Sequence, residues 1–366
     1  AGPYCSMQLG MLGADVVKIE EPGAGDQCRG IGADNDIGAI GMPPFYLAMN
    51  ANKRSMTLDL KHKSAKGIVE RLVAGADVVM QNFRPGVIDR LGFGYEAMRA
   101  VKPDLIYCSI SGYGQDGPSS AAPAYDGAIQ AVSGMMSVTG DPRTGPTRVG
   151  FTVVDLGTAL MASYAVAGAL FRRARTGLGQ HLDVSMLDTS LSLLSPLISS
   201  WLNVGQAPEL VGNGSVVKLP TADAFACAEG SILMSAITAK QWAGIQAAIG
   251  RPDLGADPRF ADEAGRRENR AALREILLAA FASDTAANWE KRLNAQGVPA
   301  SAILTVPEIV QHPQVAHSGP CGRAGGGIGE VGPHGLLDRV CGQFFVTDTA
   351  VELGNAQDRK STRLNS

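Results

Sequence analysis

The sequence lacks a pronounced excess of charge of either sign. Its 32 lysines and arginines stand against 35 aspartates and glutamates, which gives a formal net charge of −3. A protein that binds nucleic acid or an anionic membrane over a broad surface carries a clear basic excess. The balance therefore excludes such a surface as the expected function, and any site for an anionic ligand has to be local.

Disulfide and metal motifs are missing as well. The six cysteines are widely separated and form no CxxC pair, and the five histidines show no spacing typical of metal ligands. No signal-peptide pattern is present either. We therefore expect no disulfide framework, no metal site and a location in a reducing cytoplasm.

Long apolar runs are also absent. The longest weakly charged stretch, residues 151–171, contains Asp155 and several small or polar residues, so it predicts a buried helix and not a membrane span. Glycine, in contrast, is abundant, with 45 residues and no Gly-X-Y period, which predicts many tight turns and excludes collagen.

Three familiar catalytic motifs do not occur: the GxxxxGK[ST] phosphate loop, the HExxH zinc pair and the GxSxG nucleophile elbow. Residues 327–332 match GxGxxG, but no predicted strand precedes them and Pro333 follows where a helix should begin. A dinucleotide site needs that strand and that helix, so we do not expect one here.

Short apolar runs alternate with amphipathic segments from residue 16 to about residue 185. This alternation is typical of an α/β domain with a largely parallel sheet. Hydrophobic residues make up 45% of the chain and charged ones 18%, which is enough to bury a core. Strands are predicted at residues 16–19, 77–80, 105–110 and 181–186, and helices at 64–74, 95–101, 126–137 and 155–173.

The pattern changes after about residue 200. Residues 224–228 and 231–235 flank Glu229-Gly230 as the strands of a hairpin do, and residues 240–249 and 267–281 predict helices. We expect a smaller α+β domain here. The glycine-rich stretch 319–335 predicts a linker.

The expected organisation has four parts. A large domain covers residues 1–200, a small domain covers 201–320, and a linker with a C-terminal return to the large domain covers 321–357. Residues 358–366 read DRKSTRLNS, which a common sequencing-adapter segment encodes in one frame, so we expect a non-native tail. The chain opens without Met, and we expect that an upstream strand has been cut off.

Basic residues gather near a predicted strand end. Residues 52–55, which include Arg54, precede a strand-like run that Lys61 follows, and residues 82–86 (Asn-Phe-Arg-Pro-Gly) lead from another strand into a helix that carries Arg90. Open α/β sheets bind ligands where strands end and helices begin, and free N–H groups there favour anions. The cluster either holds the phosphates of a ligand or forms a solvated charged face, and composition alone leaves the two about even.

Asp155 is a lone carboxylate inside the otherwise apolar run Val-Val-Asp-Leu-Gly. A buried aspartate has to be hydrogen-bonded, paired or functional, because burying an isolated charge is costly. At the start of a long helix the ordinary interpretation is an N-cap residue. The alternative is a nucleophilic carboxylate at the helix N-terminus.

Taken in order, these stretches resemble the class III CoA-transferases, a family that also includes carnitine-type CoA-transferases, formyl-CoA transferase and α-methylacyl-CoA racemase. The resemblance implies a large Rossmann-like α/β domain with a parallel sheet, a smaller α+β domain, and a homodimer of two interlocked chains. It is carried by Gly-Pro-Tyr at 2–4, Leu-Gly-Ala-Asp-Val-Val-Lys-Ile-Glu at 12–20, Asn-Lys-Arg-Ser at 52–55, Ala-Asp-Val-Val at 76–79, Asn-Phe-Arg-Pro-Gly at 82–86 and Arg-Thr-Gly-Leu-Gly-Gln at 175–180.

The resemblance also implies roles for individual residues. Asp155 falls on the catalytic aspartate, which attacks an acyl-CoA thioester to form an aspartyl anhydride and then an aspartyl-CoA thioester. An aspartate suits this role because it is ionised near neutral pH and needs no separate base. Tyr125 and Asp126 fall beside the acyl pocket. The CoA-contacting positions are Leu58, Lys61, Asn82, Phe83, Arg84 and Arg90, and we count Arg54 with them.

The implied substrates are acyl-CoA and a free carboxylic acid, with no tightly bound cofactor and no nucleic-acid or membrane partner. Glu21 departs from the family pattern, since many relatives have a basic residue there that faces the CoA nucleotide. A GGGGQ-like loop is not found in the small domain, which argues against formyl-CoA transferase proper.

Two alternatives to CoA transfer stay open. One is a racemase, which needs acid/base groups on both faces of the α-carbon. Racemases of the family resemble His-Asp where this chain has Tyr125-Asp126, so the imidazole base is missing and transfer is favoured. The other is a CoA-binding paralogue that has lost its chemistry, which Glu21 and the missing N-terminal stretch would suit.

Overall fold

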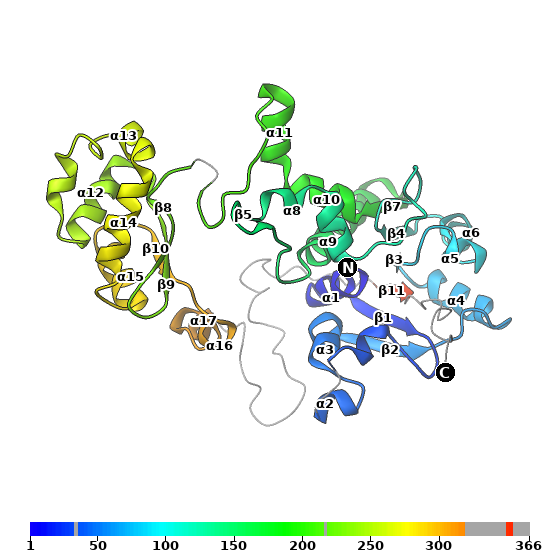
Figure 1. Cartoon of the computed structure of the whole chain (residues 1–366). Helices are drawn as coiled ribbons and strands as arrows, with labels where there is room; N and C mark the ends of the chain where they lie inside the picture. The colour runs from blue at the N-terminus through cyan, green and yellow to red at the C-terminus, as the bar shows by residue number, and fades with distance from the viewer. Residues whose placement is uncertain (33–35, 216–217, 319–348, 354–366) are drawn as a thin grey trace, which may run out of the picture. The chain divides into compact units, whose positions relative to one another are not determined.

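The computed structural model describes residues 1–32, 36–215, 218–318 and 349–353, and these form two compact units (Figure 1). Unit 1 contains the described residues of 1–135, 149–207 and 318–366, and unit 2 contains those of 136–148 and 208–317. Residues 136–148 therefore pack with the second unit. The predicted linker at 319–335 and the predicted tail at 358–366 lie outside the described residues.

Among the described residues, unit 1 is built on a six-stranded sheet in the order β2-β1-β11-β3-β4-β7. Every neighbouring pair is parallel, so the predicted α/β fold class is confirmed. The strands are β1 (Asp15–Glu20), β2 (Lys53–Thr57), β3 (Val78–Gln81), β4 (Ile106–Ser111), β7 (Gln180–Ser185) and β11 (Thr349–Leu353).

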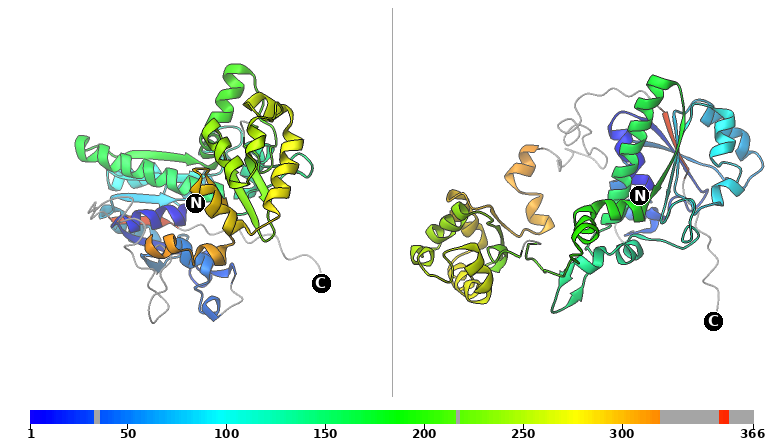
Figure 2. Two further views of the ribbon diagram at one scale, coloured as in Figure 1. Left: turned by 90° about the vertical axis from the view of Figure 1, so that its left-hand side faces the viewer. Right: turned by 90° about the horizontal axis from the view of Figure 1, so that it is seen from above.

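Helices cover both faces of this sheet. In the right-hand view of Figure 2 the sheet is seen nearly edge on, with helices on either side. The helical elements are α1 (Gly2–Met11), η1 (Gln27–Gly30), α2 (Asp36–Ala39), α3 (Pro44–Asn50), α4 (Ala65–Ala74), α5 (Val87–Arg90), α6 (Tyr95–Val101), α7 (Asp126–Val132), α8 (Met135–Val138, where the two units meet along the chain), α9 (Val153–Thr176), α10 (Met186–Leu193) and α11 (Ser195–Val204).

The alternation of side chains along each strand divides the core into two layers. Val78 and Met80 of β3 pack in one cluster with residues of α1 and α9, whereas Val79 between them packs in the other cluster with residues of α4 and α6. The sequence predicted β1, β3, β4 and β7 to within about one residue. Strands β3 and β4 are buried along their whole length, as the apolar character of their sequences indicated, whereas β1 and β7 also carry charged residues.

One predicted helix of unit 1 is wrong as a single element. Residues 126–137 form α7 and α8, which are separated at Ser133 and Gly134. Gly134 has φ +85°, a left-handed conformation that ends a helix.

Helix α9 is long and apolar enough to cross a membrane by length and composition alone. Its buried residues include Ala159, Ala162 and Val166, which pack in one cluster with residues of the sheet. The helix is therefore a core helix of unit 1, as residues 151–171 predicted.

Unit 2 has an antiparallel sheet in the order β10-β9-β8, which confirms the predicted hairpin. Residues 267–281, predicted as one helix, form two that are interrupted at Asn269. The elements are β5 (Gly140–Asp141), β6 (Gly145–Pro146), β8 (Ala222–Ala226), β9 (Ser231–Ser235), α12 (Ala239–Ala248), η2 (Pro252–Gly255), α13 (Glu263–Glu268), α14 (Arg270–Phe281), α15 (Ala286–Ala295), β10 (Ala300–Ala302), α16 (Val306–Ile309) and α17 (Pro313–Ser318).

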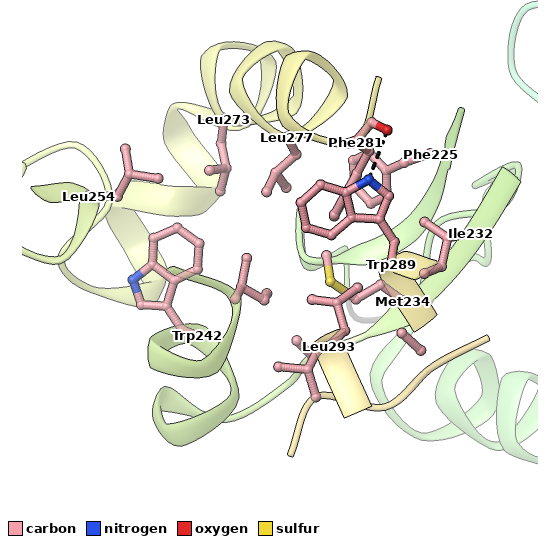
Figure 3. Packing of buried hydrophobic residues seen from close by; sticks show 14 of the residues in the cluster. Phe225, Ile232, Met234, Trp242, Leu254, Leu273, Leu277, Phe281, Trp289 and Leu293 are labelled. Atoms are coloured by element: carbon pink, nitrogen blue, oxygen red, sulfur yellow. Dashed lines mark hydrogen bonds between the residues drawn. The ribbon is translucent and has the colours of Figure 1, made fainter. Parts of the chain in front are cut away.

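The core of unit 2 lies between this sheet and helices α12, α14 and α15 (Figure 3). Phe225 and Trp289 both pack edge-on against Phe281, with ring centroids 5.4 and 5.2 Å away. The Trp289 indole N–H also donates to the Phe281 carbonyl oxygen over 3.0 Å. A buried tryptophan with its one polar group satisfied is a stable core element.

Candidate functional site

The carboxyl ends of the parallel strands define where a ligand is expected. The chain moves from β1 outward to β2, and then to β3, β4 and β7 on the other side of β1, so the strand order reverses around β1 and β3. Open α/β sheets bind ligands at such a switch point, beyond the strand ends. The residues that follow β1, β2 and β3 are therefore the ones to examine.

Asp155 lies in the first turn of α9, and its side chain is about one third exposed, at 32%. The N-cap residue of α9 is Thr152, so the interpretation of Asp155 as an N-cap is wrong. The Ala1 amino nitrogen lies 2.9 Å from Asp155 Oδ1.

The N-terminus of α9 is capped by another carboxylate, that of Asp126. Asp126 Oδ2 accepts hydrogen bonds from the backbone N–H groups of Val154, at 2.9 Å, and Asp155, at 3.1 Å. Its Oδ1 accepts from Nε2 of Gln130 at 2.6 Å. Both oxygens of the buried Asp126 are therefore engaged, and the predicted acyl-pocket residue holds the helix on which Asp155 lies.

Tyr125 directly precedes Asp126 and is the N-cap residue of α7. The residue is 59% exposed.

Asn82 lies against the start of α1, close to Asp155. A Cβ atom added to Gly2 would come within 3.1 Å of Asn82 Cγ. Gly2 is bonded to Ala1, whose nitrogen contacts Asp155. The loop that follows β3 and the first turn of α9 therefore both lie at the N-terminus of α1. Two predicted site residues, 73 positions apart in the sequence, are thus brought together.

The loop after β3 is shaped by Gln81, a residue that the sequence analysis did not single out. Its Oε1 accepts from the backbone N–H of Phe83 at 2.8 Å, and its Nε2 donates to Ser109 Oγ on β4 at 2.9 Å. Phe83 packs in the core with an exposed fraction of 2%, so it anchors this loop to the core of unit 1.

The cations Lys61, Arg84 and Arg90 are all exposed and, in the part of the chain that the structure describes, none of them forms an ion pair. Gly86, with φ +76°, permits the sharp turn into α5, and a Cβ atom added there would lie 3.1 Å from Arg90 Nη1. Leu58 continues the β1-β2 pairing, since its N–H donates to the Glu20 carbonyl oxygen at 2.9 Å. Cations without carboxylate partners can take up phosphate groups.

Arg54 is not brought to this group. Its guanidinium forms a forked ion pair with the carboxylate of Asp15, with Nε 2.9 Å from Oδ1. Asp15 begins β1 and Arg54 lies near the beginning of β2, so the pair sits toward the amino ends of these parallel strands. The other predicted CoA residues follow the carboxyl ends of β2 and β3.

A buried charge network at the end of β1 is a second feature that sequence reasoning missed. Glu20 accepts two hydrogen bonds from Arg29, at 2.7 and 2.8 Å, one from Ser55 at 2.6 Å and one from the backbone N–H of Asp26 at 2.8 Å. Burial alone would raise the pKa of Glu20, but these hydrogen bonds outweigh it and lower the pKa to about 2. The sequence did contain an indication of this network, because Lys18 and Glu20 are charged residues two positions apart in an otherwise apolar strand.

The fold and this arrangement of residues have counterparts among known proteins. The sequence model of the CoA-transferase family III matches residues 1–325 of this chain, and the chain belongs to that family. The chain is 38% identical to acetyl-CoA:oxalate CoA-transferase of Acetobacter aceti, over 89% of this chain and 82% of that one. It is 34% identical to succinyl-CoA:glutarate CoA-transferase of Mus musculus, over 87% of this chain and 72% of that one.

Among solved structures, the chain is similar to a CaiB/BaiF family protein from Brucella suis. The TM-score is 0.80 at 32% sequence identity, and the match covers 93% of this chain and 95% of that one. The predicted family and its α/β fold are therefore confirmed. The roles of the individual site residues stay predictions.

Proposed function

We propose that the protein transfers CoA from an acyl-CoA to a free carboxylate, with Asp155 as the nucleophile. The observation that carries the proposal is the state of the two carboxylates at the start of α9. Asp126 takes the backbone N–H groups of the first turn, and the partly exposed Asp155 is left to react beside the loop that carries Asn82 and Arg84. Membership of CoA-transferase family III supports the same activity.

The transfer divides into balanced covalent steps. An Asp155 oxygen attacks the thioester carbonyl carbon, CoA thiolate leaves, and a mixed anhydride forms. The thiolate then attacks the aspartyl carbonyl of the anhydride and releases the first carboxylate, which leaves an aspartyl-CoA thioester. The acceptor carboxylate attacks that thioester and the thiolate returns to the new acyl group, so Asp155 is regenerated as a carboxylate.

We place the CoA phosphates near Lys61, Arg84 and Arg90, with Leu58, Asn82 and the loop that the buried Phe83 anchors along the same path. Support comes from the exposure of the three cations and from their position after the carboxyl ends of β2 and β3. The ion pair of Arg54 with Asp15 argues against its predicted role in binding CoA. For the acceptor we propose a short dicarboxylate, because the relatives above are named for oxalate and glutarate.

The racemase alternative finds no support in this geometry. Removing and returning a proton at the α-carbon needs two bases, and both oxygens of Asp126 already accept hydrogen bonds. The neighbouring residue is Tyr125, where racemases of the family have the imidazole of a histidine.

We also propose a homodimer, in the interlocked form that the resemblance implies. Helix α11 contains no buried residue although its sequence is largely apolar, and Leu202 and Val204 are 75% and 72% exposed. It stands away from the sheet of unit 1 in Figure 1. A second copy of the chain is the occupant that would cover such a helix, and a monomer mass in light scattering at micromolar concentration would contradict the proposal.

The cytoplasmic location remains part of the proposal. The four cysteines within the described residues, Cys5, Cys28, Cys108 and Cys227, form no disulfide there, which suits a reducing compartment.

The activity is tested with an acyl-CoA and a panel of labelled carboxylates. We expect label to appear in a new acyl-CoA. During turnover, hydroxylamine should react with the activated aspartyl carbonyl and leave an aspartyl hydroxamate at position 155. Asp155→Ala should abolish both signals while CoA still binds. If hydroxylamine treatment of the wild-type protein yields no adduct at Asp155, the protein is a CoA-binding paralogue. Deuterium exchange at the α-carbon without CoA transfer would identify a racemase.

A further inference from the structure

We propose that Gln130 and Asp126 act together as a positioning pair that fixes the reactive carboxylate of Asp155. The inference rests on the proposed CoA transfer and assigns a role to Gln130, which neither the sequence pattern nor the family resemblance singled out. Both residues lie on α7, one helical turn apart, and Gln130 is completely buried.

The pair forms a chain of hydrogen bonds with a fixed direction. The backbone N–H of Val149 donates to Gln130 Oε1 at 2.9 Å, so the amide of Gln130 must present its Nε2 to Asp126. Gln130 Nε2 donates to Asp126 Oδ1, which leaves Oδ2 to accept from the N–H groups of Val154 and Asp155. Each group in the chain thus has one possible role, donor or acceptor.

The consequence for catalysis is geometric. Asp126 holds the peptide N–H of Asp155 itself, so a rotation of Asp126 moves the backbone that carries the nucleophile. Gln130 prevents that rotation and also ties the site to Val149, the residue at which the chain returns to unit 1 after residues 136–148. Misplacing a reacting group by about 1 Å costs on the order of 100-fold in rate.

The directionality of the network makes the proposal testable by an exchange of groups. In Asp126→Asn the new amide places an NH₂ group against either Gln130 Nε2 or the helix N–H groups, so two donors face each other in every orientation. In Gln130→Glu two carboxylates face each other. The double variant D126N/Q130E restores a donor opposite an acceptor at every link and keeps the wild-type net charge, because the carboxylate has moved from position 126 to position 130.

We expect each single substitution to lower kcat by roughly 10- to 100-fold with little change in KM for acyl-CoA, and the double variant to recover most of the loss. The rate of hydroxamate trapping at Asp155 should follow kcat. If the carboxylate of Asp126 itself reacted with substrate, the double variant, which has an amide at position 126, would not regain kcat. A purely structural role would lower the unfolding temperature without changing kcat per folded molecule.

The outcomes separate the inference from the proposed function. If the wild-type chain transfers CoA and D126N has an unchanged kcat, the positioning role is overturned and the function stands. A folded double variant that regains stability but not kcat overturns it as well. If D126N does not fold, Gln130→Met tests the same link, because it removes the donor that orients Asp126 together with the acceptor of the Val149 N–H, and an unchanged kcat would be the contrary result. No transfer by the wild-type chain would refute the function and this inference together.

Discussion

The buried carboxylate of Glu20 gives a prediction whose size can be worked out from the structure. Its pKa of about 2 lies below the ordinary value of 4.5. A difference of that size stabilises the ionised form in the folded state by about 3 kcal/mol. Glu20 is 3% exposed, so solvent screens its pair with Arg29 only weakly.

The substitution Glu20→Gln should therefore lower the free energy of unfolding by about 3 kcal/mol at pH 7, because the amide cannot accept the forked pair and leaves Arg29 without its counter-charge. The folded-state pKa is the lowered one, so the stabilisation is fully present above about pH 4.5 and is lost as the pH falls from there toward 2. Urea unfolding at pH 7, 4 and 3 should show wild type and variant converging as the pH falls.

Asp15→Asn is the matched control for this experiment. Asp15 lies on the same strand and also forms a forked pair with an arginine, but Asp15 and Arg54 are 52% and 67% exposed. An exposed pair contributes less than about 1 kcal/mol, so this variant should stay close to wild type. Two results would refute the reasoning. One is an equal loss of unfolding free energy in both variants, and the other is a difference in unfolding free energy between wild type and Glu20→Gln that does not shrink as the pH falls.

Two further predictions concern the CoA path. Arg84→Ala should raise KM for acyl-CoA roughly fivefold, which corresponds to about 1 kcal/mol of lost phosphate contact. Arg54→Ala should leave KM unchanged. An equal rise in both variants would contradict the proposal that CoA binds at the carboxyl ends of β2 and β3. Gln81→Leu removes the acceptor for the buried N–H of Phe83, so it should cost about 1–3 kcal/mol of stability and raise KM for acyl-CoA, and steady-state kinetics with an unchanged KM would show that the loop does not depend on Gln81.

Much of unit 1 could be predicted because its elements follow local rules. Strands β3 and β4 are largely apolar runs that are buried along their length, and α6 was predicted with the bounds that it has. The break between α7 and α8 was also local, since Ser133-Gly134 is a common helix stop, and it was overlooked within an apolar pattern. The position of β11 between β1 and β3 could not be predicted, because strand order depends on pairing between residues more than 250 positions apart.

The candidate site divides in the same way. Asp155 was found because a charge inside an apolar run has to be explained, and the family resemblance then gave it a role. The partners that hold it are invisible in sequence, because the hydrogen bond from Val154 to Asp126 spans 28 residues and joins a backbone group that any amino acid would provide. Arg54 was grouped with Lys61, Arg84 and Arg90, although it pairs with Asp15 near the amino end of β2, because sequence proximity does not distinguish the two ends of a strand.

In the proposed transfer, the different roles of Asp126 and Asp155 explain why two carboxylates lie at the start of α9. The free N–H groups of a helix N-terminus attract the nearest anion, and a carboxylate that accepts such hydrogen bonds is stabilised as an anion and is a weaker nucleophile. If Asp155 satisfied the first turn of α9, it would have to break those bonds in order to attack. Because Asp126 already occupies them, the helix start is satisfied and the oxygens of Asp155 are not drawn into capping it. A residue at position 126 that cannot accept these hydrogen bonds, as in Asp126→Leu, would therefore be expected to slow the attack, even where the fold was preserved.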